Sequence, residues 1–211
     1  MTATSAPVAR SKEDIVEQFR MRSILEGALR VIARRGVAAA TMQDVADEAG
    51  IAKGTIYLYF ESRDELVRRV AEEAFSRLEA RLAEALSTPG HATVRLRRLV
   101  ETKIAFFDDH RELFRAYLAA CQAEAGAASR RRPATYDLHL RRLVAFLEAA
   151  MAAGELRRAD AERLALFVSE GITAVVRRRL SEPEPPPARR DVEWIASMLL
   201  DGLSAGPRSG C

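Results

Sequence analysis

The chain has 211 residues, of which 48% are hydrophobic and 30% charged, and a formal net charge of +3 at pH 7. A chain of this length buries enough surface to fold without a metal or disulfide staple, and its two cysteines, Cys121 and Cys211, suggest neither a disulfide framework nor a zinc site. No apolar run approaches the roughly 20 residues of a membrane span, and the polar N-terminus lacks a signal-peptide core. We therefore expect a cytoplasmic protein that does not bind membranes.

The charges are distributed in a way that weakens any argument from net charge. Residues 1–68 hold ten Lys and Arg against ten Asp and Glu, and the rest of the chain holds 23 against 20. Binding to nucleic acid therefore has to be argued from the residues that project from a motif, and not from a basic domain.

The first helix is predicted from near Ser11, where Ser11 and Asp14 have the spacing of a capping box, to Gly36. Residues 1–10, before it, are small and polar, and we expect them to be disordered. The helix carries an apolar face at helical spacing: Ile15, Phe19, Ile24, Leu25, Ala28, Val31 and Ile32. The basic residues near its start form either a basic arm or an ordinary solvated surface; they are Arg10, Lys12, Arg20 and Arg22.

Two short helical patterns follow back to back between Thr41 and Phe60. The first spans 41–49 and begins with Thr41 and Asp44 in capping-box spacing, and Gly50 supplies a turn in which positive φ favours glycine. The second spans about 53–59, with Ile56 turned inward, which is typical of a helix-turn-helix. Its outward face suits the base edges and phosphates of a DNA major groove and consists of Lys53, Gly54, Thr55, Tyr57, Leu58 and Tyr59.

This stretch resembles a known family. The run T-x-x-x-V-A-x-x-A-G-I-x-K-G-T-I-Y-x-Y-F from Thr41, followed by S-R-D-E-L from Ser62, is similar to the DNA-binding domain of TetR family transcriptional regulators. The similarity is dense from about Ser23 to Leu66. It implies a homodimer whose two recognition helices enter successive major grooves of a palindromic operator, with half-sites roughly 34 Å apart.

The resemblance also implies roles for single residues. Thr41 matches a phosphate contact at the start of the first motif helix, where the helix N-terminus also favours an anion. Lys53 and Gly54 match the opening of the recognition helix, where Gly54 lets the backbone approach DNA and Lys53 reaches a phosphate or a guanine. The remaining matched positions are base-facing Thr55 and Leu58, phosphate-facing Tyr57 and Tyr59, and backbone-clamping Arg63. Ala52 departs from the pattern, because family members often have Ser or Thr there, and the missing cap typically costs about 1 kcal/mol.

Only helical patterns follow the motif. The helix at 62–86 is long enough to connect a DNA-reading head with a second domain, and further helices are predicted at 93–108, 112–125, 133–153, 160–180 and 189–203. Residues 181–187 are acidic and proline-rich and indicate an exposed link, and 206–211 indicate a disordered tail. We predict an all-α fold of about nine helices, with a three-helix helix-turn-helix domain in residues 11–68 and a helical bundle in residues 69–205.

By the resemblance, the second domain dimerises and binds a small effector, most simply a hydrophobic one that releases a repressor from DNA. The candidate dimer residues are Leu164, Val168, Ile172, Val175, Trp194 and Met198, with Phe167 on the same rows. The candidate pocket residues, for each of which ordinary core packing is an alternative, are Phe106, Phe107, Phe114, Tyr117, Cys121, Phe146 and Phe167. Trp194 is equally compatible with the core, and Cys121 is expected to be inertly buried.

Two rival interpretations stay open. One is a DNA-bound structural protein without an effector. The other is a magnesium-dependent helical enzyme, since Asp108, Asp109 and Glu112 mimic an acidic diphosphate motif. We expect no enzyme, cofactor or metal, because these acids straddle a helix break at which Asp109 suits an N-cap, and no second acidic motif follows. His91, His110 and His139 have no ligand spacing and are expected at the surface.

Overall fold

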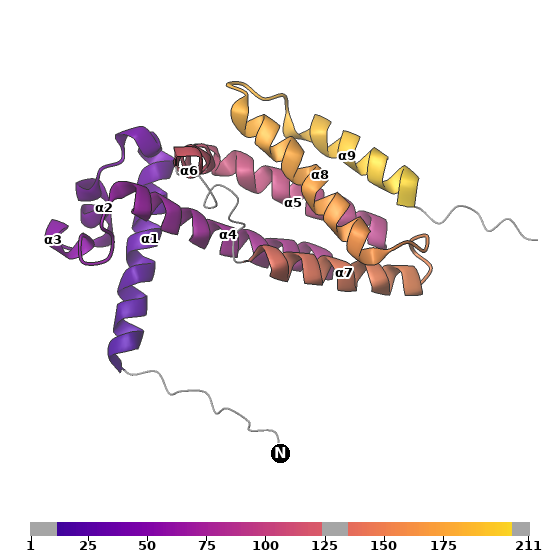
Figure 1. Ribbon diagram of the computed structural model, residues 1–211, viewed down its shortest axis with the longest axis horizontal. Coiled ribbons are helices and arrows are strands. Elements are labelled where there is room, and N and C mark those ends of the chain that lie inside the picture. The colour runs from indigo at the N-terminus through magenta and orange to yellow at the C-terminus, as the bar shows by residue number, and fades with distance from the viewer. Residues whose placement is uncertain (1–11, 124–134, 204–211) are drawn as a thin grey trace, which may run out of the picture. The chain divides into compact units, whose positions relative to one another are not determined.

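The computed structural model describes residues 12–123 and 135–203. Over these ranges the chain forms nine helices and no strand, which confirms the predicted all-α class (Figure 1). The helices are α1 (Lys12–Ala39), α2 (Met42–Ala49), α3 (Lys53–Ile56), α4 (Arg63–Ser87), α5 (Ala92–Asp109), α6 (Arg111–Ala123), α7 (Tyr136–Ala152), α8 (Ala161–Ser181) and α9 (Ala188–Leu203). The predictions for residues 1–10 and 206–211, and the start of a helix at Pro133, lie outside the described residues.

The chain divides into two compact units, Met1–Val70 and Ala71–Cys211, and α4 runs through the division. In the first unit, α1 packs against α2 and α2 against α3. Gly27 lies at the crossing of α1 and α2, where an added Cβ would come within 3.4 Å of the Ala49 nitrogen. The core of this unit is formed by fully or almost fully buried side chains: Ile24, Ala28, Val31, Val45, Ala46, Ile56, Phe60 and Val70.

The first helix bends where its sequence predicts an end. Gly36 has φ 73° and ψ 160° inside α1, so the backbone leaves helical geometry there before one further short turn to Ala39. A positive φ of this size is open to glycine at little cost. The bend brings the chain to Thr41, where α2 begins.

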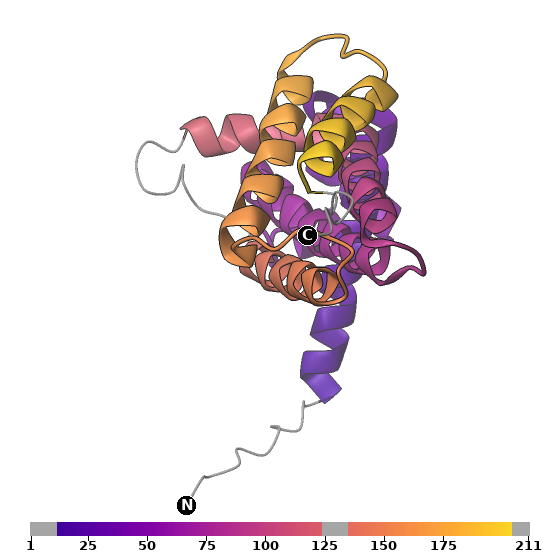
Figure 2. The same cartoon turned by 90° about the vertical axis from the view of Figure 1, so that its right-hand side faces the viewer.

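In the second unit, α5 packs against α8 and α9, and α8 also packs against α7 (Figure 1). Figure 2, which looks at the bundle from its end, shows α8 and α9 side by side. The core of the second unit includes aliphatic side chains that are at most 2% exposed: Leu96, Leu99, Val100, Ile104, Leu113, Leu143, Leu147, Leu156, Val168 and Ile172. None of the helices in the described ranges has the length and apolar character that crossing a bilayer requires.

Three local predictions differ from the structure. The recognition helix is shorter than the predicted 53–59, because α3 ends at Ile56 and residues 57–59 form turns. Asp109 is the last residue of α5 and not an N-cap of the next helix. His139 is 7% exposed and not at the surface, because its ring faces the buried carboxylate of Glu79.

Candidate nucleic-acid interface

The first motif helix begins with a complete capping box, as its sequence predicts. The Thr41 hydroxyl accepts a hydrogen bond from the Asp44 amide at 3.1 Å, and the Asp44 carboxylate accepts one from the Thr41 amide at 3.0 Å. The same hydroxyl donates to that carboxylate at 2.7 Å. Hydrogen bonds from Thr41, with Arg35 beside them, lower the pKa of Asp44. The helix therefore already has a carboxylate at its positive end, which reduces the attraction of that end for a DNA phosphate.

The turn between α2 and α3 is built around Gly50. Its φ of 68° and ψ of 33° are left-handed, and its amide donates to the Asp47 carbonyl at 3.2 Å. The next amide, of Ile51, donates to the Ala46 carbonyl at 2.9 Å. This pair of bonds is the Schellman arrangement that ends a helix on glycine, and it sets the direction in which α3 leaves the turn.

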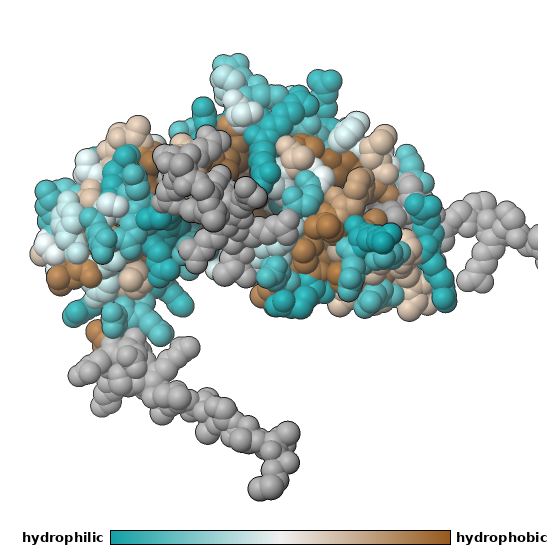
Figure 3. Space-filling view, viewed as in Figure 1, coloured by the Kyte–Doolittle hydropathy of each residue, from teal (hydrophilic) through white to brown (hydrophobic). Residues whose placement is uncertain are grey.

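The recognition segment is one helical turn of four residues followed by tight turns. The amides of Thr55, Leu58 and Tyr59 each donate to the carbonyl three residues earlier, at 2.9–3.1 Å. The fully buried Ile56 and Phe60, at 0% and 1% exposure, anchor the segment to the core. Between these anchors Leu58 is 82% exposed and Tyr57 is 49% exposed. The hydrophobic patch at the α3 end of the first unit in Figure 3 lies over this segment.

Gly54, near the start of this segment, has empty space where a side chain would begin. A Cβ added there would meet no atom within 4 Å, and the residue has no positive φ. Glycine in a helix costs about 1 kcal/mol relative to alanine, so nothing within the unit explains why glycine stands here. Ala52, at the N-cap, makes no side-chain capping bond, which agrees with the missing hydroxyl noted in the sequence.

Most of the basic residues of α1 that face α2 are paired with its acids. Arg30 contacts Glu48 at 2.7 Å, Arg34 also binds Glu48, and Arg35 contacts Asp44 at 2.5 Å. Hydrogen bonds from Arg34 and then Arg30 lower the pKa of Glu48 to about 2. By contrast, Lys53 is exposed and has no ion pair or hydrogen bond from its side chain to any described residue.

Arg63, which is expected to clamp the DNA backbone, makes hydrogen bonds within its own unit. Its guanidinium donates to the Ala40 carbonyl at 3.2 Å and to the Val37 carbonyl. These are carbonyls at the end of α1, where intrahelical donors are missing. Arg63 therefore stabilises the end of α1 and is already bound within the unit.

Residues 24–70 match the family model for bacterial regulatory proteins of the tetR family. The match covers the capped helix, the glycine turn and the recognition segment described above. The chain therefore carries a DNA-binding domain of the TetR type. It is accordingly a DNA-binding transcriptional regulator of the TetR type, and residues 41–60 are its helix-turn-helix.

Known proteins match different shares of the chain. YfiR, an uncharacterised regulator of Bacillus subtilis, is 45% identical over 53 residues, which are 25% of this chain and 26% of that protein. TtgR of Pseudomonas putida is 26% identical over 95% of this chain and 98% of its own length. FadR of Bacillus subtilis, solved in complex with stearoyl-CoA, has a TM-score of 0.66 at 18% identity and covers 86% of this chain and 98% of its own. The last likeness shows the fold alone.

Four of the seven candidate pocket residues lie together in the second unit. Phe107, Phe114 and Tyr117 surround Phe75 of α4, a residue that the sequence did not single out, and Phe106 joins this aromatic cluster through Phe107 and Phe114. Contacting ring centroids lie 4.4–6.3 Å apart. The sequence did not reveal the contribution of Phe75, because this residue belongs to a helix that was predicted only as a connector.

The other three pocket candidates make none of the ring contacts of this cluster. Phe146 packs under the guanidinium of Arg95, 4.8 Å from its ring centroid. Cys121 is half-buried and not fully buried as expected. Phe167 is 69% exposed on α8, so it lines no enclosed pocket formed by the residues that the structure describes.

The candidate dimer residues divide into two groups. Val168 and Ile172 are each 1% exposed, so they pack inside the bundle and are not free to contact a partner. Leu164 and Val175 are half-buried. Trp194 and Met198 of α9 are 58% and 59% exposed, so Trp194 is not a core residue. Phe167 and Leu166 of α8 are also exposed, at 69% and 44%, and these four side chains are called here the exposed apolar strip of α8 and α9.

The acids that mimic a diphosphate motif are held by arginines. Asp108 contacts Arg179 at 2.6 Å, and the same buried guanidinium contacts Asp191 at 2.5 Å. Glu112 lies 3.7 Å from Arg115. Arg179 thus ties α5 to α8 and α9, and Asp108 has a structural partner that the sequence did not reveal.

Lys103 is a second buried charge that sequence reasoning missed. Its ammonium donates to the Ser169 carbonyl at 3.2 Å and to the Thr173 hydroxyl at 2.9 Å, both on α8. Burial lowers the pKa of Lys103 to about 8. Its position on the inner face of α5 could have been read from the helical period, but its partners lie more than 60 residues away in the sequence.

Proposed function

We propose that the chain is a homodimeric repressor that reads a palindromic operator through residues 53–59, and that a small hydrophobic effector releases it. A repressor of this kind acts on the genome, in the cytoplasm. The observation that carries the DNA-reading part is the open state of the recognition segment. Leu58 is 82% exposed, Gly54 has no neighbour within 4 Å of an added Cβ, and Lys53 has no partner among the described residues.

Each of these residues has a role in the proposal that fits its chemistry. Lys53 binds a phosphate or the O6 and N7 acceptors of guanine, and Leu58 meets a thymine methyl group. Tyr57 and Tyr59 donate to phosphates, and Thr55 faces a base edge. Gly54 lets the helix come close to the DNA, because a Cβ there would be the first atom to collide.

Thr41 and Arg63 have weaker parts in the proposal. The Thr41 hydroxyl is engaged by Asp44, and the Arg63 guanidinium is engaged by the end of α1. Both residues therefore act first by holding the motif in shape, and a phosphate would have to share their groups.

The exposed apolar strip supports the dimer. Phe167 and Leu166 of α8 and Trp194 and Met198 of α9 are all more than 40% exposed, and α8 and α9 lie side by side (Figure 2). Two copies of this strip would bury one another about a two-fold axis as a four-helix interface. Large aromatic side chains are the residues that most often anchor such interfaces.

The aromatic cluster supports the effector site. It joins α4, which continues from the DNA-reading unit, to α5 and α6. A ligand that separates these rings would act on α4 directly, and its effect on DNA binding is bounded by its differential affinity for the two states. FadR, a regulator of the same fold, binds stearoyl-CoA, so an apolar ligand is the class to test first.

The recognition segment is tested by two substitutions. Lys53→Ala and Tyr57→Ala are each expected to weaken binding to the selected operator about ten-fold, because each removes a contact to phosphate or base. Fluorescence anisotropy on labelled operator measures the effect, and Arg163→Ala, whose side chain is 89% exposed in the second unit, is the control. If both variants bind like the wild type, residues 53–59 do not read the DNA.

The effector is tested with the same assay. Addition of a C8–C18 fatty acid or acyl thioester series is expected to lower the affinity for DNA. Phe107→Ala is expected to change the size of this ligand-induced loss. A complete lack of ligand response across apolar probes would favour the rival in which the second unit only dimerises. Repression is measured with a reporter gene placed downstream of the operator. Activation of this gene by the intact chain would contradict the repressor role.

A further inference from the structure

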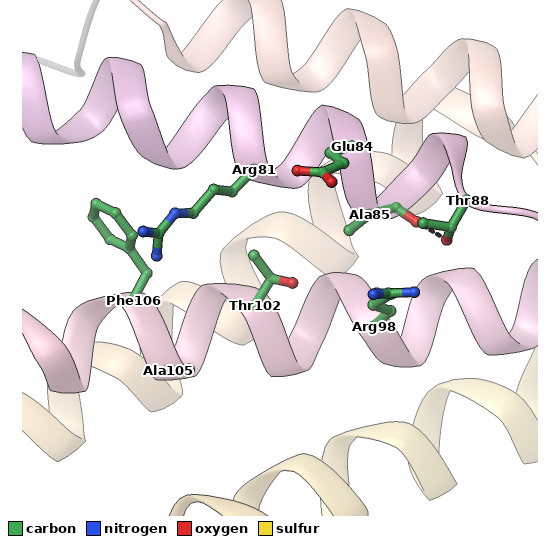
Figure 4. A pocket seen from close by; sticks show the side chains of 8 residues that line it. All are labelled: Arg81, Glu84, Ala85, Thr88, Arg98, Thr102, Ala105 and Phe106. Carbon is green, nitrogen blue, oxygen red and sulfur yellow. Dashed lines mark hydrogen bonds between the residues drawn. The ribbon is translucent and has the colours of Figure 1, made fainter.

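A groove of about 320 Å³ lies between α4 and α5, and it shares one residue, Phe106, with the aromatic cluster (Figure 4). Each of the two helices contributes one small side chain to its lining. Ala85 of α4 and Ala105 of α5 present only methyl groups to the hollow, and Phe106 closes one end. The volume is at the lower end of the range for small-molecule sites, roughly 300–1,000 Å³.

Two arginines reach this groove from opposite helices. Arg81 extends from α4 and places its guanidinium 5.2 Å from the centroid of the Phe106 ring, and Arg98 rises from α5 (Figure 4). Neither has a carboxylate within ion-pair distance in the described part of the chain. The adjacent Arg97 behaves differently, since it pairs with Glu101 at 3.1 Å on the same helix.

Hydroxyl groups add further hydrogen-bonding capacity. Thr88 donates to the Ala85 carbonyl at 2.9 Å, whereas Thr102, at the middle of the groove, makes no side-chain hydrogen bond to a described residue. Its proton is free to be donated to a ligand. The groove thus has one guanidinium group toward each end, Arg81 beside Phe106 and Arg98 near Thr88, with the Thr102 hydroxyl between them (Figure 4).

We propose that this groove binds a small organic oxyanion, a carboxylate or a phosphate ester carried on a flat ring or short chain. Guanidinium and hydroxyl donors are the groups that bind oxyanions most strongly, and the alanine methyls and Phe106 leave room for an apolar body. Glu84 is the one carboxylate that lines the groove, on the α4 side and exposed (Figure 4). Its negative charge repels an anion. Neutralising Glu84 is therefore expected to tighten anion binding.

The test is a calorimetric titration of the full-length protein without DNA, so its result does not depend on the operator or on the proposed repressor role. The probes share one ring and differ in charge: benzoate, phenyl phosphate, benzyl alcohol and benzyltrimethylammonium. Benzoate, phenyl phosphate or both are expected to bind at least about ten-fold more tightly than the neutral and cationic probes. The two anions together show whether the site takes carboxylates, phosphates or either.

Three variants locate the binding. Arg98→Ala is expected to weaken the preferred anion about ten-fold, Glu84→Gln to tighten it, and Arg97→Ala, the matched neighbouring arginine, to leave it unchanged. All three positions are exposed on helices, and circular dichroism confirms that each variant is folded. Equal binding of the four probes, no binding of either anion, or equal losses in Arg97→Ala and Arg98→Ala would each overturn the proposal.

Discussion

Thr41 shows how much of the motif depends on one hydroxyl. Its hydroxyl accepts a hydrogen bond from the Asp44 amide and donates one to the Asp44 carboxylate, and that carboxylate also accepts one from the Thr41 amide. These bonds satisfy donors that an uncapped helix leaves without partners. Because α2 has only eight residues, its start contributes a large share of its stability.

Thr41→Ala is therefore expected to destabilise the protein by about 1 kcal/mol, the usual effect of losing a Thr or Ser cap. Urea unfolding followed by circular dichroism measures the change. Thr41→Ser keeps the hydroxyl and is the control, which should stay within a few tenths of a kcal/mol of the wild type. Equal stability of the alanine and serine variants would show that the cap is unimportant.

Substitution of Gly54 is expected to increase the stability of the protein and to weaken its binding to DNA. Gly54→Ala should raise the free energy of unfolding by about 0.5–1 kcal/mol, because alanine favours the helix and its Cβ meets no neighbour. The same substitution should weaken operator binding, because the Cβ stands where the DNA backbone approaches. Denaturation and anisotropy on one preparation give both quantities. A variant that is more stable and binds normally would remove Gly54 from the interface.

At this scale the sequence predicts local chemistry well and long-range partners poorly. The capping box at Thr41 and the left-handed Gly50 follow from spacing, since both depend on neighbours in the chain. Arg63, which binds the Val37 and Ala40 carbonyls, and His139, which faces Glu79, depend on residues 23–60 positions away. No pattern in the sequence marks those encounters.

Between elements, the packing of α1 on α2 includes a charged contact with a defined pH response. Arg34 and Arg30 hold the pKa of Glu48 at about 2, below its ordinary value of 4.5. A carboxyl group whose pKa is lower in the folded state stabilises the protein fully above pH 4.5. That contribution is lost as the pH falls through about 2.

Glu48→Gln should accordingly reduce stability at pH 7, and its difference from the wild type should shrink as the pH falls from 4.5 toward 2. Thermal unfolding of both proteins across this range measures the difference. Glu101→Gln, which removes a pair within α5, is the control because its pair joins no second helix. A difference that stays constant with pH would contradict the assignment to Glu48.

Helix positions follow from periodicity, but helix ends depend on geometry that periodicity does not record. The predicted 62–86, 93–108 and 160–180 agree with α4, α5 and α8 to within one or two residues. The recognition helix was predicted too long, because Leu58 and Tyr59 bond to carbonyls three residues back and form turns. Asp109 was misplaced for a similar reason, since α5 continues to Asp109 and His110 is its C-cap.

For the whole molecule, the all-α class and the TetR-type DNA-binding domain were accessible from the sequence, the domain because its motif is dense and contiguous. The arrangement of the second unit was not. Val168 and Ile172 belong to the same helix as Phe167, yet the first two are buried and the third is exposed. The choice between these faces depends on how α7, α5 and α9 surround α8.

The exposed apolar strip gives a prediction about assembly. Phe167→Glu should shift the protein from dimer to monomer at micromolar concentration, because it places two charges in an interface that is otherwise apolar. Sedimentation equilibrium measures the shift. Val94→Glu, on α5 and 58% exposed in the wild type, is the control and should remain dimeric. A dimer that tolerates Phe167→Glu would place the interface elsewhere.

The most direct test of the proposed regulator is selection of genomic fragments by the purified protein, followed by footprinting of the selected site at two salt concentrations. The account predicts a protected two-fold-symmetric site whose half-sites lie about one turn of DNA apart, with affinity that falls steeply as salt rises. It also predicts that Lys53→Ala loses this protection. Binding to all fragments alike, or a protected site without symmetry, would contradict a dimer that reads a palindrome through residues 53–59.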